Sequence, residues 1–148
     1  MFLYGLDVSS GGPISKNQAA MDVKHYFLDL RVDPHKKSIS GTSTIQFILK
    51  EDTPILEIDL YKKLTVSGVS IGGTSLGFKH KGHKVLVENP GVELFVLHRL
   101  EIKYGGRPPI AERPPWDGGF TWERGENGDP WVGVSCQGNG AYIWYPCK

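Results

Sequence analysis

The chain has 148 residues and a formal net charge of +1, because 17 Lys and Arg side chains nearly balance 16 Asp and Glu side chains. Such a balance gives no strong field for attracting nucleic acid or an anionic membrane, so neither partner is expected. Residues 1–20 lack the basic start and apolar stretch of an export signal, and no apolar run approaches the roughly 20 residues of a membrane-spanning helix. We expect one soluble domain, with the compartment open between cytoplasm, periplasm and the exterior.

Two alternating segments open the predicted fold. Residues 23–32 place apolar side chains at every second position, as in a half-buried strand, before Asp33-Pro34 breaks the pattern. Residues 39–49 repeat the alternation, and the short polar link between the segments favours an antiparallel hairpin. We assign the preceding residues 1–21 to an amino-terminal arm, either weakly ordered or foreign to the domain, and residues 22–148 to the domain itself.

Further strands follow at similar intervals. Short ones are predicted at 55–60, 64–71, 76–80 and 84–87, with glycine-containing turns between the last three. Segment 93–104 is the longest, with His98 as a satisfied core histidine and with an in-phase apolar set formed by Leu94, Val96, Leu100, Ile102 and Tyr104. No helical apolar period occurs between residues 23 and 104, so helix should be scarce and the fold class all-β.

The carboxyl-terminal third begins with a loop. Residues 105–115 contain four prolines, which cannot donate ladder hydrogen bonds, so this segment is expected to cross between strands rather than to form one. Strands are predicted at 119–123, 131–137 and 141–145, with a turn at 126–129. Trp116, in the loop, is the plausible surface aromatic, whereas the other tryptophans are expected mainly in the core.

Cysteine and histidine do not form a recognisable site in the sequence. Cys136 and Cys147 can form one disulfide, a weak metal pair or neither, and we favour buried reduced thiols in neighbouring strands. A metal cluster of His80, His83 and Cys136 is an alternative without motif spacing. Ser135-Cys136 has no histidine nearby in the sequence, so nucleophilic catalysis is not expected.

Three short motifs and three residue pairs carry a family resemblance. The motifs are Trp-Asp-Gly-Gly-Phe at 116–120, Cys-Gln-Gly-Asn-Gly-Ala at 136–141 and Trp-Tyr-Pro-Cys-Lys at 144–148. The pairs are His25-Tyr26, Asp33-Pro34 and Ser40-Gly41. Over residues 22–148 the chain thus resembles the amino-terminal domain of M1-family zinc aminopeptidases, the group that includes leukotriene A4 hydrolase.

The resemblance implies a saddle-shaped, mostly antiparallel β-sheet sandwich that packs on a catalytic domain, and a domain truncated at its carboxyl-terminal end. Family members remove amino-terminal residues from peptides with one zinc ion and a zinc-bound water. Their two catalytic signatures, His-Glu-x-x-His and Gly-x-Met-Glu-Asn, are both missing from these 148 residues. We therefore assign the chain no catalytic residue, no metal ligand and no cofactor of its own, and expect the zinc and the enzyme activity in a longer polypeptide.

The resemblance also implies a substrate-binding role for Gln137 and Gly138. The residue at the position of Gln137 holds the free amino group of the substrate, and Gly138 lines the first specificity pocket. An amide oxygen can accept a hydrogen bond from a buried ammonium without adding a full charge, which makes glutamine chemically suitable. The alternative is that Gln137 only caps its turn through backbone hydrogen bonds.

Two other functions stay open from the sequence. One is a free-standing β-sandwich that binds peptide or carbohydrate through Trp116 and the Gln137 turn, and the other is a small hydrolase of unrecognised type. An uncovered sheet edge near residues 131–145 is expected either to pair with another chain, including a second copy, or to be shielded by residues 1–20.

Overall fold

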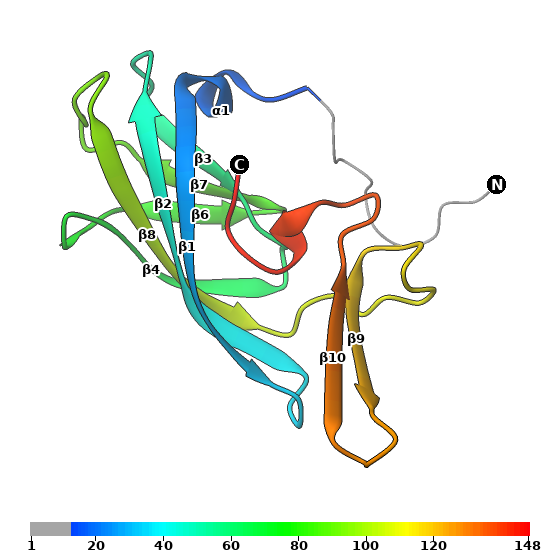
Figure 1. Ribbon diagram of the computed structural model, residues 1–148. Coiled ribbons are helices and arrows are strands. Elements are labelled where there is room, and N and C mark those ends of the chain that lie inside the picture. The colour runs from blue at the N-terminus through cyan, green and yellow to red at the C-terminus, as the bar shows by residue number, and fades with distance from the viewer. Residues whose placement is uncertain (1–12) are drawn as a thin grey trace.

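The computed structural model describes residues 13–148 as three antiparallel sheets with very little helix (Figure 1). In chain order the elements are α1 (Lys16–Ala20), β1 (Met21–Asp33), β2 (Ser38–Leu49), β3 (Ile55–Asp59), β4 (Leu64–Ile71), β5 (Thr74–Ser75), β6 (Phe78–Lys81), β7 (Lys84–Glu88), β8 (Leu97–Gly106), β9 (Gly119–Arg124), β10 (Pro130–Ser135) and the 3-10 helix η1 (Ala141–Ile143). The all-β, mostly antiparallel class is confirmed. No helix among residues 13–148 is long and apolar enough to span a membrane.

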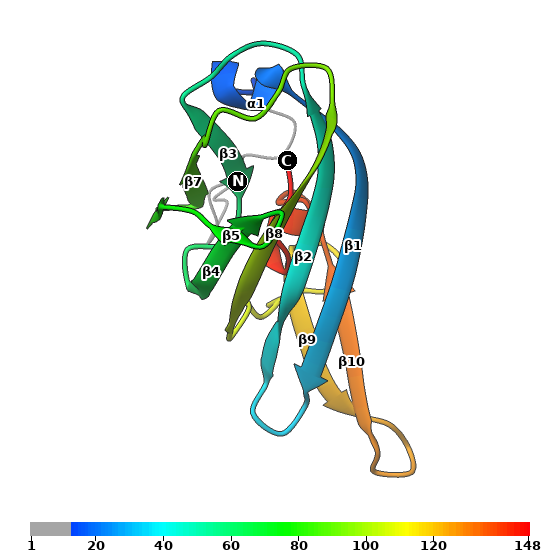
Figure 2. The same cartoon turned by 90° about the vertical axis from the view of Figure 1, so that its left-hand side faces the viewer.

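The largest sheet has the order β1-β2-β8-β4-β5 and begins with the predicted hairpin. β1 pairs antiparallel with β2, with Tyr26 opposite Ile45, and β2 pairs antiparallel with β8, with Ile45 opposite Leu100. The predicted apolar face of β2 is confirmed, because Ile45 and Phe47 are fully buried. Figure 2 shows that these long strands curve and twist together, with β1 at the border of the sheet.

The second sheet, β3-β7-β6, covers one face of the large sheet, as seen from the side in Figure 2. In β7 every second side chain is buried, whereas β3 buries Leu56, Glu57 and Ile58 in succession. The core between the sheets forms where the apolar side chains of β3 and β7 meet the inner face of β2, β4 and β8. The fully buried aliphatic side chains of the core are Ile39, Ile45, Leu49, Leu56, Ile58, Leu60, Leu64, Val85, Val87, Leu100, Ile102 and Ile143.

A single turn of helix leads into β1. Ser15 caps α1, because its Oγ accepts a hydrogen bond from Gln18 N at 3.1 Å, and Gln18 and Ala20 are buried. Of the amino-terminal arm predicted at residues 1–21, residues 1–12 lie outside the described part of the chain, while residues 16–20 form this helix. The predicted domain boundary itself stays a prediction.

The third sheet is the β9–β10 hairpin, which extends beside the lower end of β1 and β2 in Figure 1. The predicted turn at 126–129 is confirmed, with Gly125 N donating to Asp129 O at 2.8 Å. The proline-rich loop also occurs, although its first two residues still belong to β8. A parallel bridge between Ile110 and Phe120 connects the middle of this loop to the start of the hairpin.

Two predicted strands have wrong boundaries in the middle of the chain. The predicted 93–104 strand begins only at Leu97, and Leu94 and Val96 are 37% and 41% exposed. Phe95 is the cause, because it adopts a positive φ of 62° and donates its N–H to Leu49 O, which ends the ladder between β2 and β8. The predicted 76–80 strand is replaced by the shorter β5 and β6 on either side of residues 76–77.

The predicted strand at 141–145 is wrong, since residues 141–143 form η1. Gly140 has φ 85° and ψ −176°, a conformation essentially restricted to glycine, and it redirects the chain into the 3-10 turn. The predicted strand at 131–137 ends at Ser135, because Cys136 O accepts hydrogen bonds from Asn139 N and Gly140 N within the next turn.

Candidate functional site

The candidate site is the turn at residues 136–140, which joins β10 to η1. Cys136 O accepts from Asn139 N at 3.2 Å and from Gly140 N at 2.9 Å, which closes the turn. Gly138 occupies the left-handed region with φ 76°. The side chain of Gln137 is exposed and makes no hydrogen bond to the described residues, so its amide is available to a ligand. The alternative in which Gln137 caps its own turn has no hydrogen bond to support it among residues 13–148.

Asn139 fixes this turn to the loop before β9. Its side chain is 4% exposed, and a Cβ added to Gly118 would lie 2.3 Å from Asn139 Oδ1. Only glycine at position 118 therefore leaves room for this amide. The contact joins the Trp-Asp-Gly-Gly-Phe motif to the Cys-Gln-Gly-Asn-Gly-Ala motif, which the sequence separates by fifteen residues (121–135).

The loop itself is held in place by Asp117 and Ser135. The two carboxylate oxygens of Asp117 accept from Glu112 N at 2.8 Å and from Arg113 N at 2.9 Å. Ser135 Oγ donates to Pro115 O at 2.9 Å, so the last residue of β10 also binds the loop. These hydrogen bonds hold the loop in one conformation and connect it to the end of β10, directly before the Gln137 turn.

The segment after the turn passes between the two larger sheets. Tyr61 N donates to Tyr142 O at 2.9 Å, and Ser43 Oγ donates to Pro146 O at 3.1 Å. Cys147 pairs antiparallel with Asp59 through two backbone hydrogen bonds of 2.7 Å and 3.1 Å. Residues 144–148, the Trp-Tyr-Pro-Cys-Lys motif, thus form a wedge between the two larger sheets. The position of this wedge determines the position of the preceding turn.

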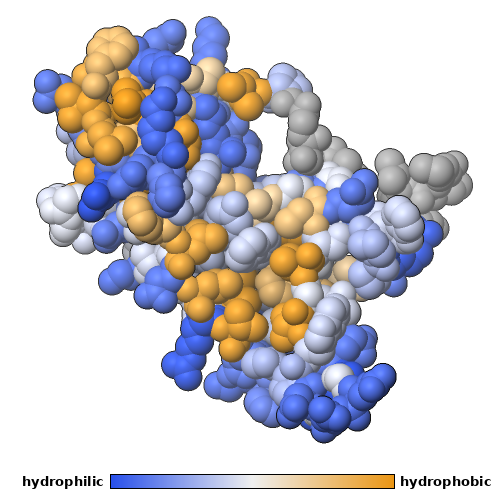
Figure 3. All heavy atoms as spheres, viewed as in Figure 1, coloured by the Kyte–Doolittle hydropathy of each residue, from blue (hydrophilic) through white to orange (hydrophobic). Residues whose placement is uncertain are grey.

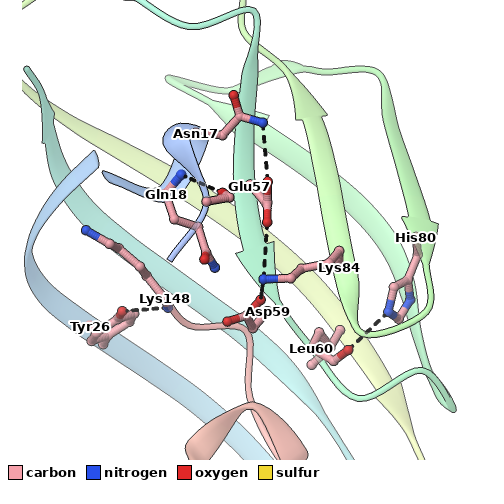
Figure 4. Close-up of polar contacts among 10 residues, drawn as sticks. Asn17, Gln18, Tyr26, Glu57, Asp59, Leu60, His80, Lys84 and Lys148 are labelled. Atoms are coloured by element: carbon pink, nitrogen blue, oxygen red, sulfur yellow. Dashed lines mark hydrogen bonds and ion pairs between the residues drawn. The ribbon is translucent and has the colours of Figure 1, made fainter. Parts of the chain in front are cut away.

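Burial in this wedge shifts the titration of its side chains. Burial raises the pKa of the Cys147 thiol to about 12 and that of Tyr26 to about 12. Tyr26 Oη accepts from Lys148 N at 2.9 Å, as Figure 4 shows, so Lys148 is held beside β1. Lys148 Nζ also donates to Met21 O. At neutral pH the Cys147 thiol and the Tyr26 hydroxyl therefore stay protonated, and neither is activated as a nucleophile.

A polar network between α1 and the second sheet has a structural role. Glu57 is nearly buried and accepts from Ser15 Oγ at 2.9 Å and Asn17 Nδ2 at 3.2 Å. Lys84 Nζ lies 3.1 Å from Glu57 Oε1 and 2.5 Å from Asp59 Oδ1, and Figure 4 shows it between these two carboxylates. Lys84 thus forms an ion pair with both carboxylates, and the neutral donors Ser15 and Asn17 complete the contacts of Glu57.

An open cleft of about 450 Å³ lies between the β1–β2 turn and the β9–β10 hairpin. It is lined by Pro34, His35, Lys37, Trp122, Glu123, Arg124, Pro130, Trp131 and Val132. Only the tryptophans could have indicated this cleft from the sequence, and the sequence predicts most of them in the core. That expectation holds for Trp122 and Trp144, which pack against the core, but Trp131 is 55% exposed; Trp116, the predicted surface aromatic, is 81% exposed.

The thiols and histidines do not converge. Cys147 is buried as expected, but Cys136 is exposed; neither is disulfide-bonded, and neither lies within a strand. His80 Nε2 lies 3.3 Å from Leu60 O, and His98 Nε2 lies 2.7 Å from Glu93 O, so His98 is satisfied but only half-buried. Among residues 13–148 no three His, Cys, Asp or Glu side chains come together in a way that holds a metal ion.

Two Gly-x-Ser-x-Gly sequences, 68–72 and 73–77, do not form nucleophile elbows. The arrangement would require a sharp turn from a strand into a helix. Instead Ser70 and Ser75 face each other on the paired strands β4 and β5. Ser70 Oγ donates to Glu101 Oε2 at 3.5 Å, and within residues 13–148 neither serine forms a hydrogen bond with a histidine. These sequences therefore give no support to the hydrolase alternative.

Known structures share this fold across most of the chain. Yeast leukotriene A4 hydrolase matches 87% of this chain and 21% of its own, with 23% identity and a TM-score of 0.71. An M1 zinc metallopeptidase from Deinococcus radiodurans, a point mutant with a Tyr-Ser-Ala substrate bound, matches 88% of this chain and 29% of its own, with 25% identity and a TM-score of 0.64. A two-domain M1 zinc metallopeptidase with L-arginine bound matches 96% of this chain and 32% of its own, with 24% identity and a TM-score of 0.66.

The match lies in the amino-terminal portion of these proteins. The chain spans about a fifth to a third of the length of the structures it matches. No protein-family profile matches the sequence, and no curated protein matches it at a significant level. The predicted resemblance to the amino-terminal domain of M1 metallopeptidases is confirmed at the level of structure.

Proposed function

We propose that this chain is the non-catalytic amino-terminal domain of an M1-like zinc aminopeptidase, which removes amino-terminal residues from peptides. The observation that carries the proposal is the match over 88% of the chain to an M1 zinc metallopeptidase that has a tripeptide substrate bound. The domain packs on a catalytic domain of the same polypeptide and closes one side of the substrate cavity.

Gln137 is the residue that receives the substrate. Its exposed amide projects from a turn whose backbone is fixed by Asn139 and by the Asp117 loop. An amide oxygen accepts a hydrogen bond from the substrate ammonium, and the absent side chain at Gly138 lets the substrate approach the backbone closely. Because the amide is neutral, the charge of the ammonium is balanced by acidic groups on the catalytic domain.

The zinc belongs to another part of the polypeptide. Zinc needs three or four Cys, His or carboxylate ligands at one point, and residues 13–148 offer no such set. The metal supplies the activated water, while this domain positions the free end of the peptide. Isolated domain should therefore bind no stoichiometric zinc in elemental analysis and should not cleave amino-acid chromogenic amides.

The gene gives the first test. A His-Glu-x-x-His motif encoded after Lys148 supports the proposal, and a stop codon directly after Lys148 refutes it. In the longer polypeptide, Gln137→Ala removes one hydrogen bond to a charged group, so kcat/KM should fall about 10- to 100-fold with zinc content unchanged. Gln137→Glu is the matched control, because a carboxylate keeps the acceptor and should retain activity. If Gln137→Ala and the wild type have equal kcat/KM, Gln137 has no role in substrate binding and only forms part of the turn.

The second candidate is a binding module for peptide or carbohydrate. It is favoured by Trp131, whose indole lies over Gly133, where an added Cβ would be 3.0 Å from the ring. The bare backbone thus supports one face of an indole that is 55% exposed, which is a suitable platform for a sugar ring or an aromatic side chain. Tryptophan fluorescence titrated with oligosaccharides tests it; an effect that survives Trp131→Ala would exclude this platform.

A further inference from the structure

One segment of the chain carries only positive charge. Residues 60–87 contain five lysines and two histidines but no aspartate or glutamate. The whole chain has 17 basic and 16 acidic side chains, so its net charge conceals this segment. Figure 3 likewise shows hydrophilic and apolar areas side by side on one face of the molecule, where the local surface departs from the average composition. A balanced net charge therefore does not exclude a local site for an anionic ligand.

The fold brings together the lysines at two turns of this segment. Lys62 N donates to His83 Nδ1 at 3.2 Å, and Leu60 N donates to His83 O at 2.9 Å, so the link between β3 and β4 contacts the turn between β6 and β7. His80 Nε2 lies 3.3 Å from Leu60 O, as Figure 4 shows, and adds a third contact. Four exposed lysines on this link and on β6 form what we name the basic cluster: Lys62, Lys63, Lys79 and Lys81.

Within residues 13–148 the basic cluster has no counter-ion. None of its four ammonium groups forms an ion pair there, whereas Lys84, in the same hairpin, is paired with Glu57 and Asp59. Lys81 also lies opposite Lys84 in the ladder between β6 and β7, an arrangement of like charges that costs stability. Cations gathered in one place without partners of their own indicate that the cluster receives an anionic ligand.

The basic cluster borders η1, which follows the Gln137 turn. Tyr61, directly before Lys62, donates its N–H to Tyr142 O at 2.9 Å, and the ring centroids of His83 and Tyr142 lie 5.2 Å apart. Five Cα–Cα steps lead from Gln137 to Tyr142, so these residues are at most about 19 Å apart. An extended peptide advances about 3.3 Å per residue and covers that distance in about six residues. A peptide whose amino terminus lies at Gln137 can therefore reach the cluster with its later residues.

We propose that the basic cluster is a subsite for peptides with acidic residues downstream of their amino terminus. The inference rests on the proposed function, in which Gln137 holds the free amino group, and it concerns the later residues of the peptide rather than the one removed. Lysines are flexible point charges that can follow a carboxylate on an extended chain. Tyr61 is buried and Phe78 is half-buried, so the aromatic residues next to the cluster offer little surface for stacking nucleic-acid bases.

A series of peptides tests the subsite in the longer polypeptide. The peptides have about ten residues and one common sequence, in which a pair of glutamates moves from the third to the ninth position; a pair of glutamines gives the reference peptide. Two exposed ion pairs should raise kcat/KM about 2- to 30-fold over the reference at low salt. The advantage should peak at one stretch of positions and shrink in about 0.5 M NaCl, because salt screens exposed charges.

The possible results separate the subsite from the proposed function. An advantage confined to one stretch of positions supports the subsite. An advantage that is equal at every position, or none at any position, overturns the subsite while cleavage of the reference peptide leaves the aminopeptidase proposal standing. A longer polypeptide that cleaves no peptide of the series refutes the proposed function and the subsite with it.

Charge-reversal variants locate the subsite on the structure. Lys62→Glu and Lys81→Glu should each lower the ratio of kcat/KM for the best acidic peptide to kcat/KM for the reference by at least about twofold. Lys16→Glu is the matched control, because Lys16 is an exposed lysine on α1 and its replacement changes the net charge equally. The ratio should not change in this control. An equal loss in all three variants would assign the preference to overall charge and overturn the subsite.

Discussion

Replacing Gly140 with alanine should measure how strongly one backbone conformation holds the candidate site. Gly140 has φ 85° and ψ −176°, a region that L-residues enter at a cost of about 1–3 kcal/mol. For a chain of 148 residues, each kcal/mol lowers the Tm by about 2–4 °C. Gly140→Ala should therefore lower the Tm by about 2–12 °C in calorimetry, and in the longer polypeptide it should raise KM by displacing Gln137.

Two further variants isolate the backbone as the cause. Gly68→Ala is the control, because Gly68 has no positive φ and its added Cβ would meet only Lys103 Cδ at 3.9 Å. That change should stay within about 0.5 kcal/mol of wild type. D-Alanine at position 140 can be introduced by ligating a synthetic peptide at Cys136, and it should restore the Tm because positive φ suits a D-residue. If D-alanine destabilises as much as L-alanine, the cause is space around the Cβ and the reasoning from φ is wrong.

Three other predictions concern the thiols, the buried carboxylate and the core. At pH 8 only about one Cys147 thiol in ten thousand is ionised, given a pKa of about 12, so a thiol reagent should label Cys136 quickly and Cys147 only after unfolding; fast labelling of both would refute its burial. Burial raises the pKa of Glu57, but hydrogen bonds from Ser15, Lys84 and Asn17 outweigh it, and the net pKa lies below 4.5. A carboxylate whose pKa is lower in the folded than in the unfolded protein stabilises the fold at pH values above its unfolded pKa, and this stabilisation is lost as the pH falls through its folded pKa. The free energy by which the wild type is more stable than Glu57→Gln should therefore shrink below pH 4.5 in denaturant titrations. A constant difference would contradict this reasoning. Phe47→Ala, at a fully buried site, should cost about 3–5 kcal/mol in guanidinium melts, whereas Phe95→Ala, at a side chain 71% exposed, should cost almost nothing.

The sequence specifies the strands best where one face is buried along its whole length. In β2 five of the six residues at every second position from Ile39 to Leu49 are buried, with half-buried Gly41 as the exception, so the alternation in the sequence is largely the alternation in the structure. The hairpin with β1 follows from the short polar link alone. The three family motifs also indicated the correct fold. They form the loop before β9, the Gln137 turn and the wedge, which contact each other in the structure.

Local patterns fail where a tertiary contact overrides them. Leu94 and Val96 are in phase with the rest of β8, yet Phe95 bonds to Leu49 O and turns the chain out of the sheet. Residues 141–145 have the composition of a strand, but Gly140 and the bond from Tyr61 to Tyr142 O make them a 3-10 turn. No periodicity in one segment can reveal a hydrogen bond to a residue 46 or 81 positions away.

The tight turn of the candidate site was predicted, while the substrate-binding role of Gln137 and Gly138 stays a prediction. The glycines at 138 and 140 indicated a tight turn, and the structure leaves the Gln137 amide exposed at that turn. The packing of Asn139 against Gly118 was missed, since nothing in either motif points to the other. The cleft between the β1–β2 turn and the β9–β10 hairpin was also missed, because it depends on how two hairpins lie relative to each other.

The last seven residues, 142–148, affect how the protein is made. They bind the first half of the chain at five places, through Tyr61, Ser43, Asp59, Tyr26 and Met21. During synthesis the ribosome must therefore release the end of this domain before its two main layers can close around the wedge. Contacts between residues so far apart in sequence form slowly. We expect nascent chains stalled within these residues to expose the unfilled interior and to depend on chaperones.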